Sequence, residues 1–142
     1  MRARATAILS TLALATTLTL ATTALAAAPA AAAGTAEYVA TVRVDGGSGS
    51  EYYRIHLVEA ADITAAFDSL SGASNQFPNG LVDRSGPEYN VGYSWHIDPN
   101  DVEFVDITME LCDGLPSDVE AGTISGDRYC PWSGRVTAMK AL

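Results

Sequence analysis

The residues best suited to chemistry in this chain lie close together in residues 93–99. Ser94, His96 and Asp98 alternate there, so a strand would place all three side chains on one face. Asp98 could then orient the imidazole of His96 for general-base work. Parallel side chains do not converge in the Ser-to-His-to-Asp chain of nucleophilic catalysis, and no Gly-x-Ser-x-Gly elbow accompanies them. We therefore expect a structural or binding role for these residues, with catalysis as an alternative.

Glu110 offers a second carboxylate for that alternative. It precedes Cys112 by two positions, so it is either an exposed strand carboxylate or half of a buried polar pair with His96 or Arg54. A small hydrolase would use His96 with Asp98 or Glu110. Glycoside hydrolysis would further require a defined separation between two acids, which depends on the fold.

An acidic stretch at residues 98–106 raises the question of calcium. The EF-hand loop requires Asp or Asn at its fifth position and Gly at its sixth, but Val102 and Glu103 stand there. A calcium site of another type stays open as an alternative, although carboxylates in so acidic a chain are usually solvated. We expect no other cofactor.

The chain has two cysteines, Cys112 and Cys130. In an oxidising compartment such a pair predicts a structural disulfide. The alternative is a zinc site completed by His56 and His96. It lacks the close Cys-Cys and His-His spacings of structural zinc sites, so the disulfide is favoured.

Two tryptophans adjoin these residues. Trp95 and Trp132 are interpreted first as core or disulfide-packing residues, because large aromatic side chains dominate the core of a small domain. The alternative is an exposed platform for a ligand. If the domain binds one, the candidate contacts are Ser94, Trp95, His96 and Trp132.

Three motifs together resemble a known family. They read Gly-x-Ser-x-His-x-Asp-Pro, Glu-x-Cys-Asp and Cys-Pro-Trp, and they occupy residues 92–99, 110–113 and 130–132. The chain is similar to a family of small secreted domains that resembles the N-terminal domain of a calmodulin-binding-type protein. The resemblance covers most of the chain after the N-terminal segment and implies common descent, but no particular activity.

The N-terminal segment has the order of a secretion signal. Arg2 and Arg4 precede an uncharged stretch of Ala, Leu and Thr, and small-x-small cleavage patterns follow from residue 24. The strongly apolar part is shorter than the roughly 20 residues that a membrane-spanning helix needs. We expect a signal peptide over residues 1–26, cleavage between about 26 and 36, an Ala-rich linker at 27–36 and a secreted domain at 37–142.

Without its signal the chain is strongly acidic. Residues 37–142 hold six basic residues against all seventeen acidic ones, which gives a formal charge of −11. Such a charge repels nucleic acids and anionic membranes. Basic proteins, cations and neutral ligands remain as partners, and about 106 residues are enough for one domain, expected to be a monomer.

Periodicity predicts an α+β fold with a mostly antiparallel sheet, one main helix packed on it and one disulfide. A helix should follow an N-cap at Asp62 and stop at Gly72. The expected strands are 37–44, 51–58, 81–84, 93–97, 102–112 and 135–139, with a helical turn at 116–121. Residues 73–92 read as a long loop apart from the short strand.

These observations favour a secreted acidic binding or interaction module. The alternatives are the small hydrolase described above and a secreted enzyme inhibitor. The inhibitor would present the loop at residues 73–92 as its contact surface.

Overall fold

The computed structural model describes residues 36–124 and 126–142. The expected signal peptide and nearly all of the expected linker therefore lie outside the described residues. No helix in the described part is both long enough and apolar enough to cross a membrane.

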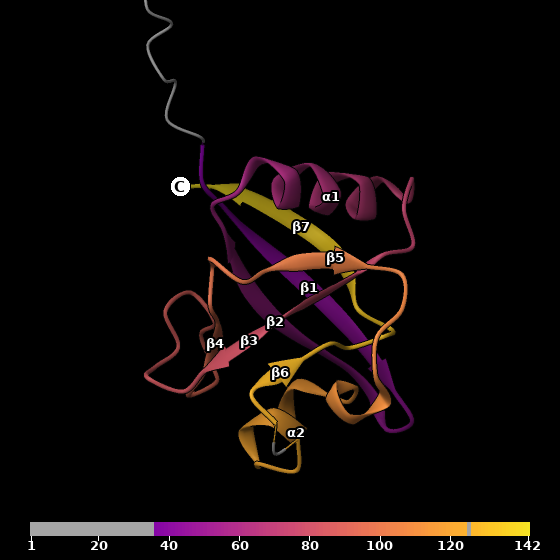
Figure 1. Cartoon of the computed structure of the whole chain (residues 1–142), viewed down its shortest axis with the longest axis vertical. Coiled ribbons are helices and arrows are strands. Elements are labelled where there is room, and N and C mark those ends of the chain that lie inside the picture. The colour runs from indigo at the N-terminus through magenta and orange to yellow at the C-terminus, as the bar shows by residue number, and fades with distance from the viewer. Residues whose placement is uncertain (1–35, 125) are drawn as a thin grey trace, which may run out of the picture. The chain divides into compact units, whose positions relative to one another are not determined.

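An antiparallel sheet forms the back of the domain in Figure 1. Strand β1 (Tyr38–Gly46) lies between β2 (Gly49–Leu57) and β7 (Arg135–Ala141). The predicted hairpin is confirmed, since β1 and β2 are joined by a tight glycine-containing turn. The predicted alternation in β2 is confirmed as well: Tyr53, Ile55 and Leu57 are buried, and the side chains between them lie on the outer face.

Helix α1 (Ala60–Ser71) packs beside β7 (Figure 1). It starts two residues earlier than predicted: the N-cap is Glu59, and Asp62 lies in the first turn, where a negative charge is favourable. The predicted stop at Gly72 is confirmed by its left-handed backbone. Ser69 faces the core and accepts the N–H of Val136 at 3.2 Å.

The second sheet is built around β3 (Phe77–Asp83), which pairs antiparallel with β4 (His96–Ile97), β5 (Glu103–Val105) and β6 (Arg128–Tyr129). The prediction of a short strand within a long loop was therefore wrong in extent, and β6 was not predicted. Pro78 and Gly80 argue locally against a strand. Gly80 is nonetheless required, because an added Cβ would clash with the side chain of Ile97.

The long strand predicted at residues 102–112 is also wrong. Strand β5 ends at Val105, which pairs with the first residue of β3, so the chain beyond it has no further β3 residue to pair with. It continues without regular structure into a 3₁₀ helix, η1 (Glu110–Cys112). Alternating apolar residues there are exposed instead of packed. Of the strand predicted at 93–97, only β4 forms.

The core lies between the two sheets and α1. Its centre is a set of aromatic rings, with Trp95 fully buried within 6 Å of Tyr53, Tyr93 and Tyr129, measured between ring centroids. A short helix, α2 (Pro116–Glu120), closes one end where a helical turn was predicted. The predicted α+β class, with antiparallel pairing and one main helix, is confirmed.

The predicted disulfide between Cys112 and Cys130 is present, which removes the zinc alternative. It ties η1 to the residue after β6. Both half-cystines are buried with Phe77, so the bridge belongs to a small apolar cluster at the edge of the core.

Candidate functional site

The side chains of the catalytic candidates do not converge. Ser94 Oγ donates to the carboxylate of Glu120 at 3.1 Å, whereas His96 Nδ1 donates to the carbonyl of Gly86 at 2.7 Å. Asp98 accepts the backbone N–H of Asn100 at 2.9 Å, which is the turn geometry expected before a proline. Each of the three therefore has a different partner, and no Ser-to-His-to-Asp chain exists among them.

The remaining candidates near this segment are also apart. Trp95 is fully buried, in agreement with its interpretation as a core residue, and presents no surface to a ligand. Glu110 lies on η1, and in the part of the chain that the structure describes its side chain has no hydrogen bond or ion pair with His96 or Arg54.

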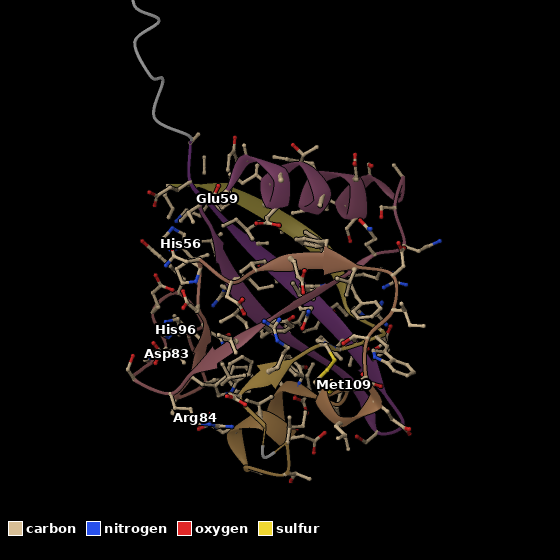
Figure 2. The ribbon with its side chains drawn as sticks, in the orientation of Figure 1. His56, Glu59, Asp83, Arg84, His96 and Met109 are labelled. Carbon is tan, nitrogen blue, oxygen red and sulfur yellow. A yellow bond between two sulfur atoms is a disulfide. The ribbon has the colours of Figure 1, made fainter. Side chains whose placement is uncertain are left out.

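The structure instead places His96 in an acidic cluster that sequence reasoning missed. His96 Nε2 lies 3.7 Å from Asp83 Oδ2 and 4.0 Å from Glu88 Oε2, on one flank of the molecule (Figure 2). The other oxygen of Glu88 is 2.9 Å from His56 Nδ1. Hydrogen bonds from Ser85 hold the pKa of Asp83 below its ordinary value, with a smaller contribution from His96.

His56 is bracketed by two carboxylates. Its Nδ1 faces Glu88 and its Nε2 lies 2.9 Å from Glu37 Oε2, while its ring packs edge-on against Tyr89. Carboxylates accept hydrogen bonds, so the doubly protonated imidazole is the form that donates to both. Glu88 has a positive φ of 45°, a conformation that a non-glycine residue adopts only when its surroundings hold it. This cluster fixes the loop to the sheet.

The loop is held by a buried amide as well. Asn90 is only 1% exposed; its Oδ1 accepts the N–H of Arg54 at 2.9 Å and its Nδ2 donates to the carbonyl of Trp95 at 3.0 Å. Asn90 therefore covers the edge of β2 and connects it to the aromatic core. Residues 84–92 lie packed along the sheet and do not protrude, which weakens the argument for an inhibitory loop.

The carboxylates considered for calcium have separate partners. Asp101 pairs with Arg128 at 2.6 Å, and Asp106 accepts from Gln76 at 3.2 Å. Within residues 36–124 and 126–142, no three His, Cys, Asp or Glu side chains are grouped so that they could hold a metal ion.

A second exposed feature lies beside the disulfide. Ile107, Met109 and Leu111 are 84%, 64% and 85% exposed, and Trp132 is 42% exposed. The carbonyl oxygen of Met109 lies 3.1 Å from Cys112 Sγ, and Figure 2 shows Met109 next to the disulfide bond. We call these four side chains the Trp132 face.

Trp132 joins two hollows on this face. One, of about 400 Å³, is lined by Ile107 and Phe77, and the other, of about 380 Å³, is lined by Asp45, Asp113 and Asp118. The N–H of Trp132 donates to Asp113 Oδ1 at 2.9 Å, which fixes the backbone that carries the indole. The exposed ring thus stands between an apolar hollow and an acidic one. This is the arrangement of the second interpretation of Trp132, an exposed platform.

A comparison with protein families identifies the chain. The family model of the BP-74 N-terminal domain matches residues 37–141. The chain belongs to this family. The match begins where the charged domain was expected to begin and includes every element of the fold. No curated protein and no solved structure shows a significant match to it.

Proposed function

We propose that this domain is a secreted binding module that uses the Trp132 face to hold a basic, amphipathic segment of another protein. The observation that carries the proposal is the exposure of Ile107, Met109 and Leu111 on one short segment beside Trp132. Single exposed apolar side chains are ordinary on a protein surface, whereas a group of large ones marks a contact surface.

The charge around the face determines which partner suits it. Asp45, Asp113 and Asp118 line the acidic hollow next to Trp132, and Asp106 lines the apolar one. A partner must therefore offer apolar side chains to Ile107 and cations to the carboxylates. The formal charge of −11 on residues 37–142 attracts the same kind of segment from a distance.

The disulfide makes the face suitable for binding. Cys112 follows Leu111 directly and Cys130 lies two residues before Trp132, so one covalent bond restrains both parts of the face. A surface restrained before binding loses less conformational entropy when the partner arrives.

Binding can be tested with a fluorescein-labelled peptide of lysine and leucine whose C-terminus is amidated, followed by anisotropy. The wild-type domain should bind it, with weaker binding at higher salt. Trp132→Ala should weaken binding by at least about tenfold, as loss of a central aromatic contact does. The matched control is Tyr52→Ala, which removes an aromatic ring of 53% exposure from β2.

The proposal fails if wild type does not bind the peptide, or if the two variants bind equally well. A peptide with glutamate in place of lysine supplies a second control, because it keeps the apolar spacing and reverses the charge. Equal binding of the two peptides would remove the electrostatic half of the proposal.

Secretion is a separate part of this proposal and has a separate test. The residues that would form the signal have a basic start, a short apolar stretch and small residues at the cleavage positions. Expression of the whole chain should yield extracellular protein whose N-terminus falls between residues 27 and 37. Recovery of the uncleaved chain from the cell fraction alone would contradict it.

A further inference from the structure

A second concave surface lies on the outer face of the β2–β1–β7 sheet. It has a volume of about 450 Å³, within the range of small-molecule sites. Val39 and Thr41 of β1 form its floor, and Tyr89 and Val91 of the overlying loop form one wall. None of these residues belongs to the Trp132 face, so the two surfaces are independent.

Strand register places two cations on opposite sides of this floor. Thr41 pairs with Arg54 of β2, and Val39 pairs with Lys140 of β7. Both long side chains rise from the outer face on the two strands that flank β1. Their backbones are about 12 Å apart across the sheet, so both head groups can reach one anion held over β1.

These cations differ from the others in the domain. The remaining four basic residues have partners: Arg43 pairs with Asp45 and Arg128 with Asp101, while Arg84 and Arg135 donate to backbone carbonyls. Within the part of the chain that the structure describes, the side chains of Arg54 and Lys140 have no hydrogen bond and no carboxylate oxygen within 4.0 Å. Although the domain carries seventeen acidic residues, its two cations without partners line the same cavity.

One carboxylate, Glu88, also lines the cavity, and its surroundings reduce its effect there. Its Oε1 lies 2.9 Å from His56 Nδ1 and its Oε2 lies 4.0 Å from His96 Nε2, so both oxygens face histidines. With Glu88 counted in full, the lining side chains still carry one positive charge more than negative.

We propose that this cavity binds an organic monocarboxylate with an apolar body. The carboxylate lies between Arg54 and Lys140, where charge-assisted hydrogen bonds hold it. The apolar body packs on Val39, Tyr89 and Val91, of which Val91 is 72% exposed in the unliganded domain. A dianion such as phosphate fits less well, because Glu88 and the net charge of the domain repel it more strongly and it has no apolar part.

Isothermal titration with octanoate tests the site in the mature domain. Arg54→Gln and Lys140→Gln should each weaken octanoate binding by about tenfold, which is the typical effect of losing one charge-assisted hydrogen bond. Arg43→Gln is the matched control: it removes the same charge from the same sheet face, at a residue outside the cavity that pairs with Asp45. Its effect should stay within about twofold, since it reports only the change in net charge.

Two further ligands separate the parts of the proposal. Octanol and inorganic phosphate should both bind far more weakly than octanoate, since each lacks one of the two recognised features. A short peptide ending in leucine, compared with its C-terminal amide, shows whether the carboxylate can also come from a peptide terminus.

Failure of both octanoate and the free-acid peptide to bind would overturn the proposal. So would equal losses for all three charge variants. Thermal unfolding of each variant confirms that its fold is intact. Because the lysine–leucine peptide is amidated and is read through Trp132, failure here leaves the proposal for the Trp132 face standing.

Discussion

Replacement of Asn90 by Ala is the sharpest test of how the loop at residues 84–92 is held. The amide makes two hydrogen bonds, one from the N–H of Arg54 at 2.9 Å and one to the carbonyl of Trp95 at 3.0 Å. It is 1% exposed, so Ala at this position leaves both backbone groups without their partner in a nearly closed space. A buried polar group that loses its partner costs about 1 to 3 kcal/mol.

The two groups are not equivalent. The Trp95 carbonyl lies in the core and has no access to water, whereas the Arg54 N–H is on the edge strand and becomes partly solvated. We assign about 2 kcal/mol to the first and about 1 kcal/mol to the second. The expected loss of about 3 kcal/mol should lower the urea midpoint by roughly 2 M.

Asn90→Asp separates the two bonds. Aspartate keeps the acceptor for Arg54 but sets a second acceptor against the Trp95 carbonyl, so at pH 7 it should destabilise at least as much as Ala. When the solution is acid enough to protonate that carboxyl, it can donate again. The stability of the Asp variant should then rise relative to that of the Ala variant.

Asn100→Ala serves as the control, because that exposed amide bonds only to Asp98. It should change the free energy of unfolding by less than about 0.5 kcal/mol. A loss below about 1 kcal/mol for Asn90→Ala, or equal losses for the two alanine variants, would refute the reasoning.

Three further predictions concern stability. Replacing Cys112 and Cys130 by Ser should cost about 3 kcal/mol for their loop of 18 residues, measured by urea unfolding; an unchanged midpoint would contradict this. Burial raises the pKa of Tyr129 above its ordinary value of 10.0, so the unfolded chain releases its proton first and stability falls as pH rises above about 10. Tyr129→Phe should make that fall shallower by about 1.4 kcal/mol per pH unit in urea titrations, and parallel curves would count against it. Gly80→Ala, whose Cβ would lie 3.0 Å from a backbone carbonyl oxygen, should cost about 2 kcal/mol, whereas Gly47→Ala has nothing within 4 Å and should be neutral.

Local patterns in the sequence predicted the hairpin, the main helix and the disulfide. They succeeded where the decisive contacts are close in sequence, as between β1 and β2, or where the chemistry allows one main outcome, as for two cysteines in an exported domain. They failed at β3, whose proline and glycine argue against a strand. That strand forms because three other strands pair with it, and one of them, β6, lies more than forty residues away.

The same distinction applies to the site. Residues 93–99 drew attention because their polar and aromatic side chains are adjacent, yet Trp95 is used for the core and Ser94, His96 and Asp98 bind separate partners. The more informative residues lie on different strands. No sequence signal marks Arg54 and Lys140 as a pair, because only strand register brings them to one cavity.

The segment after β5 shows why an alternating pattern alone cannot predict a function. Ile107, Met109 and Leu111 alternate with polar residues, which predicts a strand with one buried face. The pattern is compatible equally with a set of side chains that face a partner, because it records only that apolar groups share one side. What decides between the two is whether a strand is present to pair with this backbone. Strand β3 ends its pairing at Val105, and the apolar side of the segment is therefore left exposed beside Trp132.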